Sequence, residues 1–324
     1  MDKKLDYTLL FRIAKAYYLD NKTQQEIAEI ENFSRSQISR LLKRALDENL
    51  VRYTLNFPMN VDGEALQEQL RLHLGIDQVL LVPSFYQNTR KSHADEIYKN
   101  LALGVADQLH ELLGDCKTVG VGWGRAVYNT SLYVRPHKYV KGRTFVPLIG
   151  LSGDSNPMLQ VNTIVDRFGE RFHAERKYVN MQSIRPRELI SSRDQECIDD
   201  LKEKWKDLDA AIVGIGGAPT GTKNLIPEFP RSYKRQIQGS GTVGDILAQF
   251  FYEDGQIFDM DSRFHLLALD IHQLREVKNV IAIATGTEKC KAIYCASKLN
   301  LIKTLVTDYD TAKAILQADH QAKE

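Results

Sequence analysis

Residues 34–44 carry four basic side chains and no acidic one, a composition suited to contact with phosphate groups. Arginine matches guanine edges and glutamine matches adenine edges, while the more C-terminal cations suit DNA phosphates. This segment therefore predicts a DNA-reading helix. The candidate DNA contacts are Thr23, Gln24, Ser34, Arg35, Ser36, Gln37, Ser39, Arg40, Lys43 and Arg44.

Two tandem capping boxes predict the elements that would position these side chains. Thr23 with Glu26 opens one helix, and Ser34 with Gln37 opens the next. Asn32 lies between them and tolerates the left-handed conformation that a tight turn needs. The spacing indicates a helix-turn-helix.

Residues 51–57 alternate in polarity and predict a strand, which would be the wing of a winged helix-turn-helix. The alternatives are a merely solvated basic helix pair and a protein-interaction module. One recognition helix covers only a few base pairs, so useful specificity implies a dimer or a larger assembly.

Three glycine-rich segments, residues 120–125, 150–154 and 285–289, follow predicted strands and could hold an anion. Glycine lets backbone N–H groups approach an anion, and a helix N-terminus adds partial positive charge. In an open parallel sheet, ligands bind at the carboxyl ends of the strands. None of the segments matches a dinucleotide or P-loop fingerprint. For each of them, a simple tight turn is the alternative.

Short apolar runs alternate with helical patterns through the rest of the chain. Strands are expected at residues 78–82, 118–122, 144–149, 210–215, 279–284 and 301–306. Helices are expected at residues 64–74, 95–113, 125–134, 159–175, 242–251, 288–299 and 311–316. This alternation predicts an α/β fold with a mostly parallel sheet covered by helices. Pro147 argues for an edge or a bulge at its strand.

Length and composition limit the class of protein. At ~150 residues per domain, 324 residues suggest two domains, placed at 1–57 and 58–324. With 43 basic and 42 acidic side chains the net charge is +1, so DNA binding would need a local patch. The scattered four cysteines and eight histidines suggest neither disulfides nor a metal site. Neither a signal peptide nor a membrane span is expected, and the chain is placed in the cytoplasm without a cofactor.

The chain resembles the SorC family of bacterial sugar-responsive transcription regulators over nearly its whole length, most closely the sorbitol/sorbose type. The motifs are TQQEIA at residues 23–28, SRSQISRLLKR at 34–44, VGWGRA at 121–126, VGIGG at 213–217, TVGDIL at 242–247 with Phe250 and Phe251, and LVTDYDTA at 305–312. Many members read Gly-Gly where this chain has residues 146–153, and residues 215–230 suggest a lid or a tetramer contact.

The resemblance implies an effector domain folded like sugar-phosphate isomerases and deaminases but without catalysis. Its partners would be double-stranded operator DNA near a sugar or polyol operon, a sugar or sugar phosphate, and further copies of the chain, usually in a tetramer. The implied effector contacts are Gly122, Trp123, Gly124, Arg125, Ser152, Gly153, Asp154, Asp245 and Lys289. Asp245 would accept hydrogen bonds from sugar hydroxyls, and Lys289 would pair with a phosphate or hydroxyl. The alternatives are a carboxylate that stabilises its own helix for Asp245, and a solvated lysine for Lys289.

Two other functions are alternatives to a sugar-responsive regulator. A sugar-phosphate isomerase or deaminase would need a positioned acid and base. The titratable candidates are Asp259, Asp261, His265, Glu170, Arg171 and His173. These side chains are expected at turns and on solvated helix faces, so the chain is not expected to be an enzyme. The other rival is a DNA-binding oligomer without a small-molecule effector.

Overall fold

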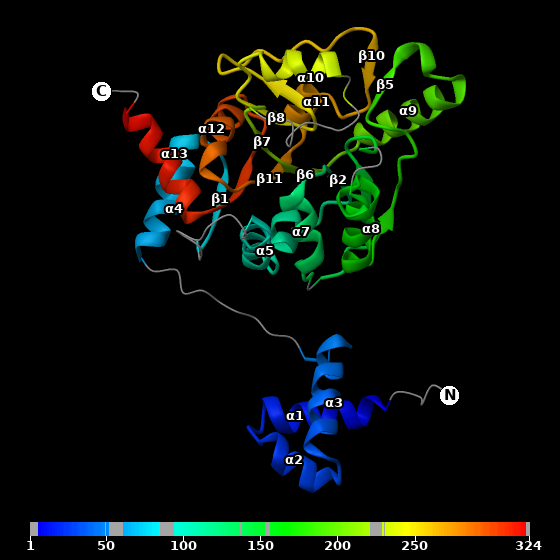
Figure 1. The fold of residues 1–324 in the computed structure, drawn as a ribbon, viewed down its shortest axis with the longest axis vertical. Coiled ribbons are helices and arrows are strands. Elements are labelled where there is room, and N and C mark those ends of the chain that lie inside the picture. The colour runs from blue at the N-terminus through cyan, green and yellow to red at the C-terminus, as the bar shows by residue number, and fades with distance from the viewer. Residues whose placement is uncertain are drawn as a thin grey trace. The chain divides into compact units, whose positions relative to one another are not determined.

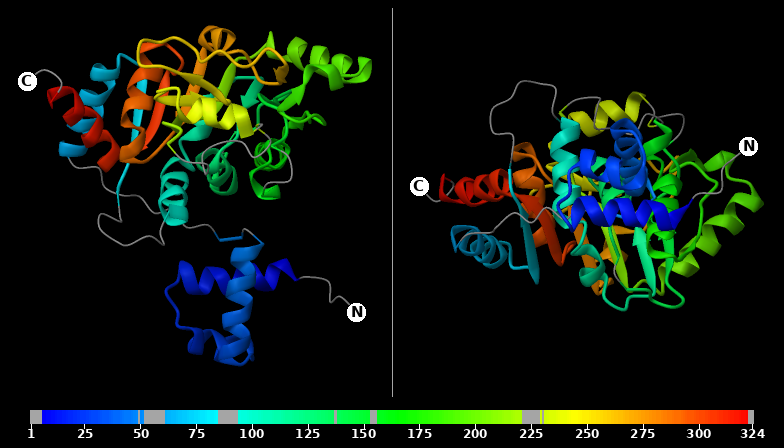
Figure 2. Two further views of the ribbon diagram at one scale, coloured as in Figure 1. Left: turned by 45° about the horizontal axis from the view of Figure 1, so that its top comes forward. Right: turned by 90° about the horizontal axis from the view of Figure 1, so that it is seen from below.

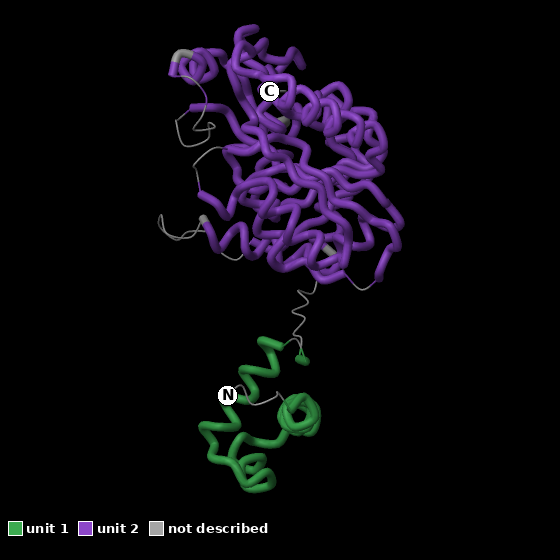
Figure 3. The backbone as a smooth tube through the Cα atoms, turned by 90° about the vertical axis from the view of Figure 1, so that its right-hand side faces the viewer, with its two compact units in different colours: residues 1–58 green, residues 59–324 purple. Residues whose placement is uncertain are grey.

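The chain divides into two units, Met1–Pro58 and Met59–Glu324, in the computed structural model (Figure 3). The structure describes residues 6–48, 50–51, 61–84, 94–136, 138–152, 156–220, 229 and 231–321. Within these ranges, no helix combines the length and the apolar content that would be needed to cross a membrane. The predicted wing at residues 51–57 lies almost entirely outside the described residues.

Three helices form the N-terminal unit: α1 (Tyr7–Tyr18), α2 (Gln24–Glu31) and α3 (Arg35–Asp47). Asn32 ends α2 in the left-handed conformation, with φ 55°, as the sequence predicts. Apolar residues from all three helices form a small core. Its buried members are Ile13, Ile27, Ala28, Ile38 and Leu42. The helix-turn-helix prediction is confirmed.

Both predicted capping boxes are present and fix where α2 and α3 begin. The Thr23 N–H donates to Glu26 Oε2 at 2.7 Å, and the Glu26 N–H donates back to Thr23 Oγ1 at 3.2 Å. Ser34 and Gln37 make the same reciprocal pair at the start of α3. Because each box satisfies two otherwise unpaired N–H groups, local sequence alone sets the register of the helix-turn-helix.

Seven parallel strands form the central sheet of the second unit (Figure 1). Their spatial order is β1 (Gln78–Val82), β12 (Thr304–Asp308), β11 (Asn279–Ile283), β6 (Ala210–Gly214), β2 (Thr118–Val121), β3 (Thr144–Pro147) and β4 (Glu175–Arg176). Six of these match the expected strands, and the short β4 was not expected. The predicted α/β class is confirmed.

Helices cover both faces of the sheet (Figure 1). On one face lie α5 (Ala94–Val105), α7 (Arg125–Tyr133) and α8 (Val161–Phe172), and on the other lie α10 (Arg231–Gln238), α11 (Ile271–Glu276) and α12 (Cys290–Lys298). Next to β1, α4 (Val61–Leu74) and α13 (Tyr309–Gln321) pack side by side (Figure 2). The remaining helices are α6 (Leu109–Leu113) and α9 (Ser192–Trp205).

The strand order reverses between β2 and β6. From β2 the chain proceeds outward through β3 to β4, and from β6 it proceeds the other way through β11 to β12. In sheets of this kind, ligands bind where the order reverses, beyond the carboxyl ends of the strands. The topology therefore directs attention to the loops that follow β2 and β6.

Pro147 occupies the last position of β3, where no neighbouring strand would accept a hydrogen bond from the N–H that proline lacks. The neighbouring β4 pairs with β3 only at Thr144 and Phe145. The Leu148 N–H donates to Val121 O at 2.9 Å, so the nitrogen of the preceding Pro147 faces away from β2. The strand is thus an edge strand at this position, as proline requires.

The helix expected at residues 242–251 is wrong. This segment is a hairpin of β8 (Gly244–Ile246) and β9 (Gln249–Phe251), which joins β7 (Gly216–Gly217) in a small antiparallel sheet. Leu247 and Ala248 form its turn with φ of 52° and 62°, a conformation that no helix contains. The alternative for Asp245, a carboxylate in the first turn of its own helix, is therefore also wrong.

Two element boundaries also differ from expectation. The helix expected at residues 95–113 is two helices, α5 and α6, separated by a turn. The strand expected at residues 301–306 begins later: Leu301 and Ile302 are buried but precede β12, which begins at Thr304. The second antiparallel pair of the unit is β5 (Ile184–Pro186) with β10 (Phe264–Leu266).

Candidate functional site

The second helix of the helix-turn-helix, α3, separates a buried apolar face from an exposed polar one. Ile38, Leu42 and Ala45 are buried. The exposed residues include Arg35, Ser36, Ser39, Arg40, Lys43 and Arg44. The sequence-predicted DNA contacts of α3 thus share one solvent-facing surface that contains every cation of the helix. The preceding Gln24, at the start of α2, is half-buried.

The cap residues are less available for DNA than their types suggest. The Gln37 side-chain oxygen accepts the Ser34 N–H at 2.8 Å, so it is already used when the helix forms. A bidentate contact of Gln37 to adenine needs both ends of the amide. Arg40 folds along its own helix, with Nε donating to Ser36 O at 3.3 Å, but its guanidinium stays exposed. Arg40 is therefore the stronger candidate for a base contact.

In the second unit, two predicted effector residues from different loops share one aromatic ring. The Arg125 guanidinium carbon lies 5.1 Å from the centre of the Tyr98 ring, and Lys289 Nζ lies 5.8 Å from it. Arg125 begins α7 after β2, and Lys289 ends the 3-10 turn η4 (Thr287–Lys289) after β11. Among the described residues, neither cation forms an ion pair. Two cations that approach the same ring from different loops form a potential anion site.

Asp245 supplies the acidic group of this cluster. It lies on β8 opposite Gly216 of β7, and its Oδ2 accepts the Ala248 N–H at 3.2 Å. A Cβ on Gly216 would lie 1.8 Å from Asp245 Oδ1, so only glycine leaves room for this carboxyl. Burial raises the pKa of Asp245 to about 6, although the Ala248 N–H and the Lys289 ammonium act to lower it. A carboxyl with this pKa changes charge near neutral pH.

We expect Asp245→Asn to stabilise the protein at pH 7.5 by ~1–2 kcal/mol relative to wild type, and to have little effect at pH 4. The folded-state pKa of about 6 exceeds the ordinary 3.8, so the wild type loses stability as pH rises from about 4 to 6. Asparagine keeps the acceptor for Ala248 but carries no charge. Urea denaturation of both chains at the two pH values measures the difference. An equal difference at both pH values would contradict this account.

The residues of the loop after β2 differ in how available they are to a ligand. The Gly122 N–H donates to Ile212 O at 2.8 Å, so it serves the sheet and is not free for a ligand. Trp123 is half-buried, and Gly124, with φ 119°, is the N-cap of α7. A glycine cap leaves the first N–H groups of α7 without a side-chain partner, close to Arg125.

The loop after β3 is only partly described. Ser152 is buried, and its N–H donates to Gln160 Oε1 at 2.9 Å. Gly153 and Asp154 lie outside the described residues. The structure therefore brings Arg125 and Lys289 together at Tyr98, with Asp245 close enough to Lys289 for the ammonium to lower its pKa. Trp123 belongs to the same loop as Arg125, two residues before it.

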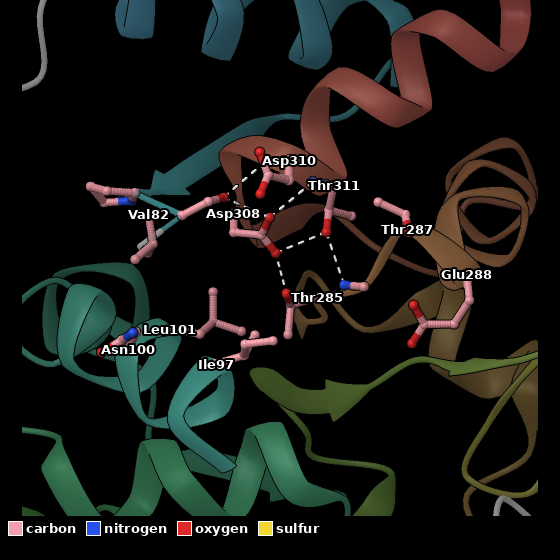
Figure 4. A pocket seen from close by; sticks show the side chains of 13 residues that line it. Val82, Ile97, Asn100, Leu101, Thr285, Thr287, Glu288, Asp308, Asp310 and Thr311 are labelled. Carbon is pink, nitrogen blue, oxygen red and sulfur yellow. Dashed lines mark hydrogen bonds between the residues drawn. The ribbon is translucent and has the colours of Figure 1, made fainter. Parts of the chain in front are cut away.

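Sequence reasoning missed Tyr98 and a cavity of about 230 Å³ at the carboxyl ends of β1, β11 and β12 (Figure 4). Side chains of α5 and η4 line this cavity, and Asp308 lies in its wall. The sequence around an aromatic residue on an amphipathic helix does not indicate that two cations far away in the chain will contact its ring. The cavity is formed by loops from three separate strands, which only the fold brings together.

Asp308 is the centre of a hydrogen-bond network that joins these loops (Figure 4). Its Oδ1 accepts the Ser84 hydroxyl at 3.0 Å and the Thr311 N–H at 2.9 Å. Its Oδ2 accepts the Thr311 hydroxyl at 2.8 Å and the Thr285 hydroxyl. The Gly286 N–H in turn donates to Thr311 Oγ1 at 2.8 Å. Asp308 therefore fixes the start of α13 and the loop that leads to Lys289.

Replacing Asp308 with alanine is expected to lower the free energy of unfolding by about 3 kcal/mol, because buried hydroxyl and N–H donors lose their acceptor. Asp308 is only 9% exposed. Asp207→Ala, at an exposed aspartate, is the matched control and should change stability by less than ~0.5 kcal/mol. Denaturant unfolding of both variants gives the comparison. Equal stability of the two variants would show that the network is dispensable.

Two of the titratable residues named as catalytic candidates, Asp261 and His265, lie in well-defined surroundings. Arg263 holds the Asp261 carboxylate in the same turn, and this hydrogen-bonded pair lowers the pKa of Asp261 to about 2. His265 is half-buried on β10, and burial lowers its pKa. In the described part of the chain, no group of three or more His, Cys, Asp or Glu side chains could bind a metal ion.

Comparison with known proteins identifies the family to which the chain belongs. Residues 61–317 match the family model described as "Putative sugar-binding domain", and residues 12–48 match "Sigma-70, region 4". The chain is 27% identical over 326 residues to the "Sorbitol operon regulator" of Klebsiella pneumoniae, covering 98% of this chain and 100% of that protein. It is 28% identical over 314 residues to the "Transcriptional regulator LsrR" of Escherichia coli (strain K12), covering 95% and 94%.

Solved structures agree with this fold. The crystal structure of the full-length sorbitol operon regulator SorC from Klebsiella pneumoniae superposes with a TM-score of 0.70 at 26% identity, covering 96% of this chain and 99% of that one. A transcriptional regulator from Streptococcus pneumoniae TIGR4 also gives a TM-score of 0.70, at 24% identity, covering 81% and 100%. The two curated relatives are transcriptional regulators, not enzymes.

Proposed function

The chain belongs to the SorC/DeoR-type family of sugar-binding transcriptional regulators, and from this membership we propose that it controls a sugar or polyol utilisation operon. In this proposal, α3 binds operator DNA, and a phosphorylated sugar bound in the second unit changes the affinity for that DNA. Residues 1–57 would serve DNA binding, and residues 58–324 would serve effector binding and assembly.

The observation that carries the effector proposal is the pair of cations on Tyr98. Arg125 and Lys289 approach the same ring without an ion-pair partner among the described residues, and Asp245 lies on the neighbouring hairpin. Two cations suit a phosphate, and a carboxylate suits sugar hydroxyl donors. The group combines both near the carboxyl ends of β2, β6 and β11, the edge at which open α/β sheets bind ligands.

The other predicted effector residues take supporting roles in this proposal. Trp123 and Gly124 would line the sugar pocket, and N–H groups at the start of α7 would face the anion. Ser152, Gly153 and Asp154 would contribute from the loop after β3. Gly122 would act through its place in the sheet, since its N–H is already bonded to Ile212.

On the DNA side, the exposed face of α3 would enter the major groove. Arg35, Ser36, Ser39 and Arg40 would lie toward the bases, and Lys43 and Arg44 toward the phosphates. Thr23, Gln24, Ser34 and Gln37 would hold the two helices at the backbone. Because one helix reads few base pairs, we propose that the regulator acts as a homo-oligomer, a tetramer in the family pattern.

The effector would act by biasing two states of this oligomer that differ in DNA affinity. A ligand can shift such an equilibrium only by the difference between its affinities for the two states. A sugar phosphate that binds both states equally would leave transcription unchanged.

A thermal-shift panel on the full chain tests the effector class. The probes are D-sorbitol, D-sorbitol 6-phosphate, fructose 6-phosphate, ribose 5-phosphate and inorganic phosphate. A ligand at 100 times its Kd should stabilise the protein by ~2.7 kcal/mol, which a melting curve resolves. We expect selective shifts with sugar phosphates that vanish in Lys289→Gln. Shifts of the same size in Lys289→Gln would show that this site does not bind the effector.

A further inference from the structure

The cavity at the carboxyl ends of β1, β11 and β12 is not accounted for by the proposed anion site. None of the sequence-predicted effector residues lines its volume of about 230 Å³. The apolar lining includes Val82, Ile97 and Leu101; Asn100 lies beside Leu101 on α5, and Glu288 lies across from them (Figure 4). An apolar wall facing a few polar groups is the usual composition of a small-molecule site.

The polar part of the wall is already ordered without a ligand. Each oxygen of Asp308 accepts two hydrogen bonds, from Ser84, Thr285 and Thr311. A carboxylate has about four acceptor positions, so Asp308 has little capacity left for a ligand. Asp308 thus builds the wall, and Asn100, Thr287 and Glu288 are polar lining residues outside this network.

The charge of the cavity excludes the anionic end of an effector. The described lining includes the carboxylates of Glu288, Asp308 and Asp310 and contains no lysine, arginine or histidine. A phosphate placed here would meet only like charge, at a high desolvation cost. Hydroxyl groups can donate to Glu288 and both donate to and accept from Asn100.

The cavity and the anion site are built on the same two segments. Ile97 lines the cavity, and the next residue, Tyr98, carries the two cations. Likewise Glu288 lines the cavity, and the next residue is Lys289. Consecutive Cα atoms are ~3.8 Å apart, so the cavity and the anion site adjoin along the backbone of both segments.

We propose that this cavity receives the uncharged polyhydroxylated end of the effector, with Asn100 and Glu288 as its specificity residues. The inference rests on the proposed function, in which Arg125 and Lys289 bind the phosphate. The two ends of the ligand then occupy two compartments: the phosphate lies in the anion site, and the polyhydroxylated end lies in the cavity. The effector class is then an acyclic or cyclic polyol monophosphate without a second anionic group.

The test compares two probes on the full chain by calorimetric titration: D-sorbitol 6-phosphate, which would occupy both compartments, and inorganic phosphate, which would occupy only the anion site. Asn100→Ala and Glu288→Gln should each weaken D-sorbitol 6-phosphate by about tenfold and leave phosphate within about twofold. Lys289→Gln, as the contrasting variant, should weaken both probes. Melting temperatures without ligand should match wild type, since Asn100 is only half-buried and Glu288 is exposed.

The other possible outcomes contradict different parts of the proposal. If Asn100→Ala and Glu288→Gln leave D-sorbitol 6-phosphate binding unchanged, or weaken phosphate equally, the cavity is not the polyol compartment. Tighter binding of glucosamine 6-phosphate than of D-sorbitol 6-phosphate would assign the cavity to an ammonium group instead. If the wild type binds neither probe, the proposed function fails, and this inference fails with it.

Discussion

Arg40→Ala is expected to weaken binding to the operator by ~1–3 kcal/mol and to relax sequence preference at one position of each half-site. Arg40 lies on the exposed face of α3, and no carboxylate within ion-pair distance neutralises its guanidinium among the described residues. An arginine on a base edge loses two directed hydrogen bonds when truncated. The loss should therefore be large for the operator and small for random DNA.

Lys43→Ala is the matched control on the same helix face, three residues further on. A phosphate contact should weaken all sequences roughly equally and should lower the dependence of log K on log salt by about 1. Fluorescence anisotropy with operator and scrambled duplexes at several salt concentrations separates the two behaviours. If Arg40→Ala affects both duplexes as Lys43→Ala does, α3 does not enter the groove as proposed.

Asp245→Ala is expected to abolish the effect of the sugar on DNA binding while leaving operator affinity without ligand unchanged. Effectors commonly change affinity at a second site by 5- to 150-fold, ~1–3 kcal/mol of coupling, and this variant should lose that factor. Asp245 belongs to the second unit, so the helix-turn-helix keeps its own core.

Asp254→Ala is a suitable control for this prediction, because Asp254 is exposed, close in sequence, and bonds only within its own turn at Gln256. Operator affinity is measured for both variants with and without D-sorbitol 6-phosphate. A response in Asp245→Ala equal to that of Asp254→Ala would remove Asp245 from the effector site. Loss of DNA binding without ligand in Asp245→Ala would indicate a structural role only.

The helix-turn-helix could be predicted from sequence because its determinants are local. Thr23 with Glu26 and Ser34 with Gln37 mark the helix starts, and Asn32 marks the turn. The buried strands could also be predicted, because a strand covered on both faces is a continuous apolar run. In both cases the signal lies within a few residues of the structure it specifies.

The hairpin at residues 244–251 could not be predicted in the same way. Val243, Leu247 and Phe250 recur at helical spacing, but they are buried by tertiary contacts. Leu247 packs against Gly122, and the Phe250 ring lies 6.4 Å from the Phe229 ring. The left-handed turn at Leu247 and Ala248 has no glycine or asparagine to indicate it. Tertiary packing here overrides the local pattern.

The proposed effector site was predictable only in part for the same reason. Arg125, Asp245 and Lys289 each follow a glycine-containing motif, so their loops could be singled out. The approach of Arg125 and Lys289 to Tyr98, and the cavity next to Tyr98 on α5, depend on the strand order and on α5, which no single segment specifies.

The most direct test of the regulator proposal is the affinity of the full chain for its operator, measured with and without saturating D-sorbitol 6-phosphate. The duplex is taken from upstream of the sugar operon that the protein is proposed to control, and a scrambled duplex serves as control. We expect specific binding at physiological salt that changes by at least fivefold when the ligand is added. Operator affinity that is unchanged while calorimetry shows the ligand bound would contradict the proposal.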